Sequence, residues 1–130
     1  MGILIIAAES VSHADEITNK LRKKEWNCHV NEEEKLGNFL YNHRLLFENY
    51  EYYDKFEPYS ESFISADEVI KIREFAQSIL KWLEHTKLDE NMVIDRHSVS
   101  FPKIRKYARK LSEVCDFAID NDLGLVGYGD

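Results

Sequence analysis

Near its start the chain reads Ile3-Leu4-Ile5-Ile6-Ala7-Ala8, and this run decides the fold class. The short length of the run and its β-branched isoleucines are typical of a strand rather than of a helix. Every position is apolar, instead of every second one, which indicates burial on both faces, as in a central strand. We therefore expect a small sheet with this strand inside it and helices that cover it.

The next segment predicts a helix and a second strand. Ser12 and Asp15 form a start that resembles a capping box, and apolar residues then recur at helical spacing through Leu21. Residues 27–30 predict a short strand. Together with the first strand, these elements predict a β-α-β opening of about 30 residues.

The middle of the chain predicts a further helix followed by an irregular segment. Apolar side chains between residues 32 and 53 recur at intervals of three and four, which favours a helix. Pro58 breaks helical structure soon afterwards, because proline lacks the backbone N–H and disfavours a helical conformation in the residue before it. The segment Tyr50–Glu61 is therefore expected to leave this helix as a loop.

The clearest helix in the sequence begins after this loop. Ser65 and Glu68 have the spacing of a capping box, and a continuous apolar face follows until about His85. Residues 86–99 are expected to form a connector, in which residues 92–94 predict a short strand or a plug made by the loop.

The last helix is expected to start at Ser100, where Pro102 is tolerated in the first turn, and to end at residues 121–124. Residues 125–128 predict a final strand. The expected order is strand, helix, strand, three helices and strand, which gives two to four strands and about four helices in the α+β or α/β class. Since no linker or repeat interrupts the chain, we expect one domain over residues 1–130.

Composition narrows the classes of protein to which the chain can belong. Hydrophobic residues make up 44% of the 130 residues, and the net charge is −7. This charge disfavours direct binding to nucleic acid and favours a basic partner, or simply solubility. The opening apolar run is too short for a signal-peptide core or a membrane span. Cys28 and Cys115 form no CxxC pair, so we expect a cytoplasmic protein with reduced thiols and no contact with a membrane.

The sequence contains none of the motifs that identify common enzymes. The five histidines lack zinc-binding spacing, no GxSxG nucleophile motif is present, and no helix follows the last glycines to hold a phosphate. We therefore expect binding rather than catalysis, with no catalytic residue, metal or cofactor. One alternative is a small enzyme or ligand-binding α/β domain with its site near Glu9 and Ser10, because sites in open α/β sheets often follow a strand.

The segment from Glu48 to Glu68 carries most of the net charge. Its seven acidic residues are opposed only by Lys55, so it accounts for −6 of the −7. Tyrosines interleave with the carboxylates; tyrosine is enriched at protein interfaces, and carboxylates steer a basic partner. Phe56 and Phe63 are expected to pack beneath the segment. The predicted partner-binding residues are Tyr50, Glu51, Tyr52, Tyr53, Asp54, Glu57, Tyr59 and Glu61.

The pair Tyr52-Tyr53 among carboxylates resembles the tyrosine-tyrosine recognition patch of the bacterial immunity proteins that neutralise colicin nucleases. The similarity is confined to this segment. Asp54 follows the pair where that family has proline, and that family is all-helical without an opening strand. Immunity proteins against contact-dependent inhibition toxins adopt many folds. The resemblance implies a protein that blocks a basic toxin domain, such as a nuclease, by steric and electrostatic occlusion.

A group of cations on the last helix contrasts with the acidic segment. Its members fall on the arc opposite the apolar face, and a solvated surface is the simplest interpretation. The same group would also suit pairing with the acidic segment, within the chain or between subunits. The second functional alternative is therefore a regulatory or structural subunit that self-associates as a homodimer. The cations are Lys103, Arg105, Lys106, Arg109 and Lys110.

Overall fold

The computed structural model describes residues 2–20 and 28–129. Its centre is an antiparallel sheet of four strands, β1 (Ile3–Ala8), β2 (His29–Glu32), β3 (Glu61–Ile64) and β4 (Gly124–Gly129), in the order β2-β1-β4-β3. The opening run is thus an inner strand, as its uniform apolarity predicted. The small sheet and the α+β class are confirmed. The β-α-β opening is not a parallel unit, because β1 and β2 pair antiparallel, and this excludes the α/β class.

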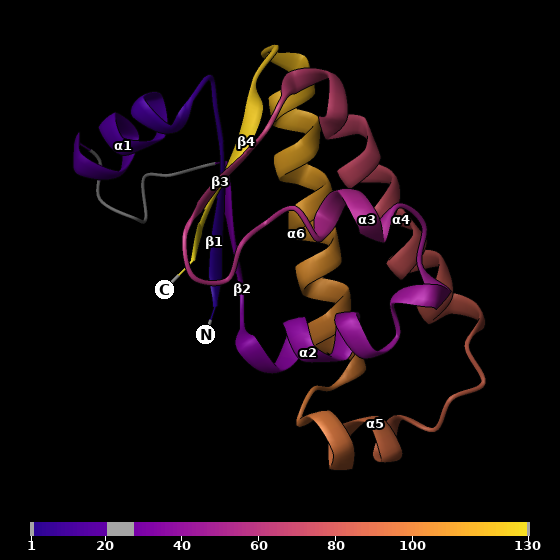
Figure 1. Cartoon of the computed structure of the whole chain (residues 1–130). Coiled ribbons are helices and arrows are strands. Elements are labelled where there is room, and N and C mark those ends of the chain that lie inside the picture. Colours follow the sequence, from indigo (N-terminus) through magenta and orange to yellow (C-terminus); the bar gives the residue numbers. More distant parts are fainter. Residues whose placement is uncertain (1, 21–27, 130) are drawn as a thin grey trace.

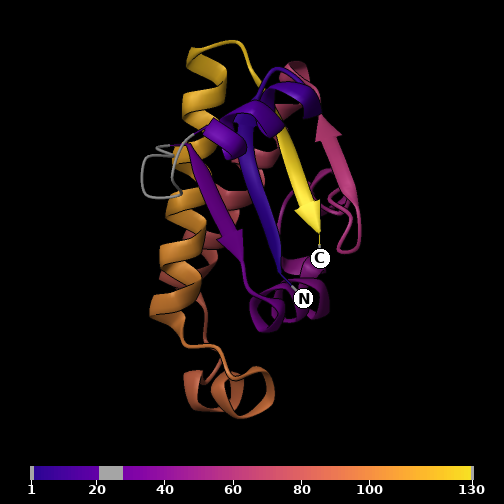
Figure 2. The same cartoon turned by 90° about the vertical axis from the view of Figure 1, so that its left-hand side faces the viewer.

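The pleat of the sheet divides its side chains between two helical layers. Ile5 pairs with Val30 and with Gly127, so these residues share the face covered by α4 (Val69–His85) and α6 (Phe101–Asp120). Ile6 and Val126 share the opposite face, which α1 (Val11–Lys20) covers (Figures 1 and 2). Helices cover both faces of the inner strands, so side chains from both faces are buried. The hydrophobic core therefore includes Ile5, Ile6, Val30 and Val126.

Helix starts follow the side chains available to accept backbone N–H groups. The side chain of Ser100 accepts the N–H of Lys103 at the start of α6, as predicted, and Pro102 occupies the first turn. At α1 the cap is Ser10, whose hydroxyl accepts the N–H of His13, and not the predicted Ser12. The predicted continuation of this helix through Leu21, and the start of the next strand at residue 27, lie outside the described residues.

The predicted helix over residues 32–53 is wrong, because the chain there is divided into three short pieces. They are α2 (Glu34–Asn42), a 3-10 turn (Arg44–Leu46) and α3 (Tyr50–Tyr53). The apolar spacing misled because Leu45 and Leu46 are exposed instead of facing the core. Asn49 adopts a left-handed conformation with φ of 60°, which a continuous helix does not permit.

Two further elements depart from the expected order. β3 adds an edge strand directly before the helix that begins near Ser65, where no strand was expected. The connector over residues 86–99 contains α5 (Glu90–His97), capped by the Asp89 side chain, in place of a strand at 92–94. Ser65 does not form a capping box; its hydroxyl contacts the carboxylates of Asp67 and Glu68 in the 3-10 turn Ala66–Glu68 before α4. No helix among the described residues is long and apolar enough to cross a bilayer.

Candidate partner-binding surface

The exposed part of the acidic segment runs from α3 into β3. We call the exposed side chains Glu51, Asp54, Glu57, Tyr59 and Glu61 the acidic surface. Tyr59 retains 73% of its accessible area, compared with 51% for Tyr41. These five predicted residues therefore lie where a partner could contact them.

The backbone beneath the acidic surface is held by a turn and two aromatic anchors. Asn49 turns the chain into α3, and its side-chain amide donates to Oε1 of Glu74 at 2.9 Å. Tyr53 stacks on Phe75 of α4 with ring centroids 4.4 Å apart, and Phe56 packs edge-on against Tyr53. A Cβ at Gly127 would lie 2.6 Å from the Phe56 ring, so glycine is what allows this ring to sit on the sheet. The predicted burial of Phe56 is confirmed.

Tyr53 is placed in the core and not on the surface, which corrects its predicted exposure. Only 4% of its area is accessible. Its hydroxyl donates to the carboxylate of Glu32 in β2, and it lies 2.5 Å from the hydroxyl of Tyr107 in α6. Since Tyr53 has one proton to give, Tyr107 is the donor between the two tyrosines. Burial raises the pKa of both hydroxyls well above the ordinary 10.0.

Glu32 is the charged centre of this buried network. It is 6% exposed, and loss of hydration raises its pKa above the ordinary 4.5, while the hydrogen bond from Tyr53 opposes that shift. Gly37 of α2 lies directly against its carboxylate, and a side chain there would collide with Glu32. The carboxyl group of Glu32 therefore connects β2 with α2 and α3, and Tyr53 extends the network to Tyr107 of α6.

A pocket of about 240 Å³ lies beside this network, and we call it the tyrosine pocket. Four predicted residues line it, namely Tyr50, Tyr53, Asp54 and Tyr59. The polar lining residues Glu32, Glu34 and Asn38 and the aromatic residue Tyr41 were missing from the predicted set. Glu32 could have been found from the sequence, because two-residue alternation places it on the same face as the buried Val30. Tyr41 carried no such signal, since it lies on another helix and only the fold brings it near.

The other predicted residues do not line the pocket. Glu51, Glu57 and Glu61 are exposed on the same segment, and Tyr52 is half-buried with the ammonium of Lys55 5.1 Å from its ring centre. Phe63, which was expected to pack down, is exposed on β3. Half of the predicted set therefore converges on one pocket, and the rest contributes charge or local packing.

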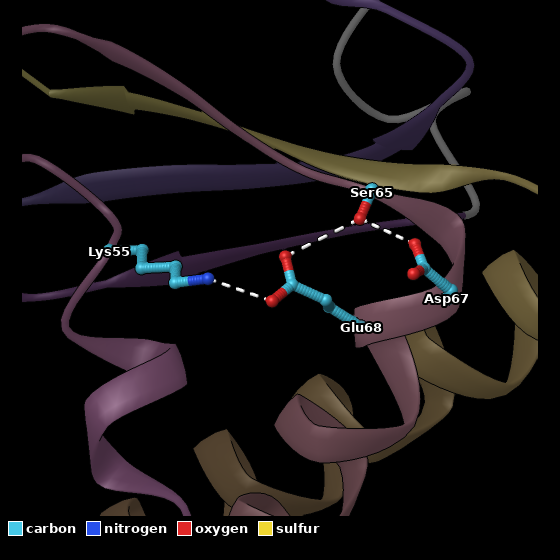
Figure 3. A network of polar contacts seen from close by, with 4 residues as sticks. All are labelled: Lys55, Ser65, Asp67 and Glu68. Atoms are coloured by element: carbon cyan, nitrogen blue, oxygen red, sulfur yellow. Dashed lines mark hydrogen bonds and ion pairs between the residues drawn. The ribbon is translucent and has the colours of Figure 1, made fainter.

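The one cation of the segment is already paired (Figure 3). Lys55 contacts Oε2 of Glu68 at 2.8 Å, and the hydroxyl of Ser65 links Glu68 to Asp67. The pKa of Asp67 is lowered mainly by its hydrogen bond from Ser65. No ion pair is found in residues 2–20 and 28–129 for the four carboxylates of the acidic surface. Their negative charge therefore remains available to an outside partner.

Glu9 and Ser10, the alternative site at the end of β1, form hydrogen bonds at the start of α1. The backbone N–H of Glu9 donates to Nδ1 of His13 at 2.9 Å, and Ser10 caps α1. Neither Glu9 nor Ser10 lines the tyrosine pocket. The part of the chain that the structure describes contains no group of three metal-ligating side chains. The two cysteines are buried, and burial raises the pKa of Cys115 to about 12.

Comparison with known proteins found no matching family model, no matching curated protein and no matching solved structure.

Proposed function

We propose that this chain is a non-catalytic protein-binding module that occludes a basic protein partner, in the manner of a toxin-immunity protein. The observation that carries the proposal is the set of unpaired carboxylates beside a pocket lined by tyrosines. Tyrosines supply large contact areas at little entropic cost, and binding energy concentrates where such anchors meet pockets. That the partner is a basic toxin domain is part of the same proposal.

The tyrosine pocket suits a lysine or arginine side chain of the partner. A cation is attracted to aromatic ring faces and to carboxylates, and Asp54 and Tyr59 supply both at the pocket. Two of the chain's own cations already make this kind of contact nearby. The guanidinium of Arg44 lies 4.2 Å from the ring centre of Tyr41, and Lys55 lies over Tyr52. Carboxylates around the pocket would add long-range attraction and speed encounter.

The test is a binding measurement with the product of a neighbouring toxin gene, using calorimetry. A variant carrying Glu51→Lys, Asp54→Lys and Glu57→Lys reverses three exposed charges of the acidic surface. We expect its affinity to fall on the order of a hundredfold, mainly through slower association at low salt.

A matched control changes the net charge by the same amount elsewhere. Glu84→Lys, Asp95→Lys and Asp120→Lys replace exposed acids on α4, α5 and α6. This variant should bind like the wild type. Equal binding by both variants would show that only net charge matters, or that the partner uses another face, and either result would refute the proposed surface.

A further inference from the structure

A second concave surface lies at the β2 edge of the sheet. A groove of about 880 Å³ is formed between β2 and α6, and we call it the basic groove. β2 and β3 are the two edge strands of the sheet, so the groove and the acidic surface flank opposite edges. Figure 2 shows α6 lying beside β2 at one edge of the sheet. The groove and the tyrosine pocket share no described lining residue, and the two meet where the hydroxyls of Tyr107 and Tyr53 lie 2.5 Å apart.

The groove concentrates positive charge in an acidic protein. All five predicted cations of α6 line it, and among the described lining residues only Glu33 and Glu113 carry carboxylates. They follow helical spacing, Lys103, Lys106 and Lys110 on one row and Arg105 and Arg109 on the next. Within the described chain none of the five cations has an ion pair. Five cations that outnumber the nearby carboxylates and form no ion pairs in the described residues suit an anionic ligand.

The strand edge supplies backbone groups as well as charge. The N–H of Ala7 donates to the carbonyl of Cys28, so this pair is hydrogen-bonded, and the alternation of an antiparallel ladder makes Val30 hydrogen-bonded to β1 too. The N–H and C=O of Asn31 therefore point away from β1, toward the open side of the strand. Asn31 lines the groove and its side chain is exposed. An added strand could pair with these groups.

The remaining lining favours a peptide over a nucleic acid. Val30, Leu36, Val99 and Pro102 supply an apolar floor between the cations and the strand. Single-stranded nucleic acids bind through bases stacked on several aromatic rings, whereas Tyr107, which is buried, and His29 are the only residues with aromatic rings among the lining residues described. Apolar side chains of an extended peptide would lie on this floor, and its acidic side chains would reach α6.

We propose that the basic groove binds an extended acidic segment of a partner protein. The segment adds a strand to β2 by pairing with Asn31, and its carboxylates contact Lys106, Arg109 and their neighbours on α6. This mode combines main-chain pairing with charge recognition, and specificity comes from alternate side chains. It requires no change at the acidic surface, so both sites can be occupied together.

The charge contribution is tested by fluorescence anisotropy with a labelled peptide of alternating glutamate and valine. Lys106→Glu with Arg109→Glu should weaken binding at least on the order of tenfold, and salt should weaken wild-type binding as well. The matched control is Lys81→Glu with Lys87→Glu, which reverses two exposed cations outside the groove. Failure of the wild type to bind the peptide, or equal loss in both variants, would overturn the proposal.

The strand pairing is tested separately. Asn31→Pro removes the outward N–H, and proline is tolerated on an edge strand, so binding should fall while the circular dichroism spectrum is unchanged. A peptide methylated at alternate backbone nitrogens tests the same pairing without changing the protein. Retained affinity for the methylated peptide in both methylation registers would overturn strand addition.

Two further experiments test other occupants of the groove. A short single-stranded thymidine oligomer that displaces the peptide and binds more tightly would assign the groove to nucleic acid and overturn the proposal. Sedimentation of the protein alone tests a second copy as occupant. A dimer that the peptide dissociates, and that Lys106→Glu with Arg109→Glu abolishes, would assign the groove to self-association instead.

Discussion

The four carboxylates and the one tyrosine of the acidic surface lie on a short helix, an irregular turn and an edge strand, whereas the lysines and arginines of the basic groove all lie on one long helix, α6. The irregular segment holds its shape because Tyr53 and Phe56 reach into the core. The cations of α6 are held by a helix whose other face is buried, and their own side chains make no ion pairs in the described residues.

Because of this difference, substitutions at the acidic surface and at the basic groove should affect the stability of the fold differently. At the acidic surface, neighbouring residues of one segment serve either the core or the exterior, so a change two or three positions away can unfold the segment instead of removing a contact. At the basic groove, charge can be changed without touching the packed face of α6. The predictions below test this contrast by their effects on the free energy of unfolding.

The largest effect is expected at Tyr53. Replacing it with alanine removes a buried ring stacked on Phe75 and leaves the Glu32 carboxylate without its donor. We expect a loss of about 3–5 kcal/mol in the free energy of unfolding, measured by urea denaturation. Tyr59→Ala removes the same side chain from an exposed position of the same segment and should change stability by less than about 0.5 kcal/mol. Similar losses for the two variants would contradict the division between core and surface.

Glu32 should produce a smaller effect that depends on pH. Its pKa is raised in the folded state, so the folded protein holds a proton that the unfolded chain releases as pH rises above the ordinary 4.5. The stability of the wild type should therefore fall relative to that of Glu32→Gln as pH rises from 4.5, and level off once pH exceeds the folded pKa. Urea denaturation of both proteins across this range measures the difference.

A control for this pH dependence is Glu33→Gln, which neutralises the adjacent, exposed carboxylate. Its stability should stay parallel to that of the wild type through the same pH range. A difference between wild type and Glu32→Gln that does not vary with pH would show that Glu32 keeps its ordinary pKa, and the opposite slope would show that folding lowers it; either result would contradict the prediction.

Elements with a strong local signal were predictable from the sequence. The uniform apolarity of β1 predicted an inner strand, and the cap at Ser100 with the apolar face after it predicted α6. β3 lacked such a signal, because it is a four-residue edge strand whose Phe63 is exposed. It is a strand because β4 offers it a partner, and that partner lies far away in the sequence.

The candidate site shows the same limit. The sequence indicated which segment is acidic and rich in tyrosine, and it located the charges of the acidic surface. It could not separate Tyr53 from its neighbours, because helical spacing within one turn does not reveal which side of the turn meets α4. The sequence also could not show that the α6 cations lie beside β2, because that placement depends on the strand order, which periodicity does not determine.

The smallest effect is expected at Lys106, and its sign is informative. Lys103 and Lys110 lie three and four positions away on the same row, so Lys106→Glu converts repulsive pairs into attractive ones. We expect the free energy of unfolding to rise by about 0.5 kcal/mol at low salt and the gain to vanish at high salt. On α4, Lys81→Glu places two acids three positions apart, at 81 and 84, so that variant should lose stability instead.

If Lys106→Glu is also destabilised, the cations are held by favourable contacts within the fold. If it gains stability but no longer binds the acidic peptide, the wild-type groove keeps mutually repelling cations at a cost to its own stability, which is the pattern expected of a surface maintained for binding.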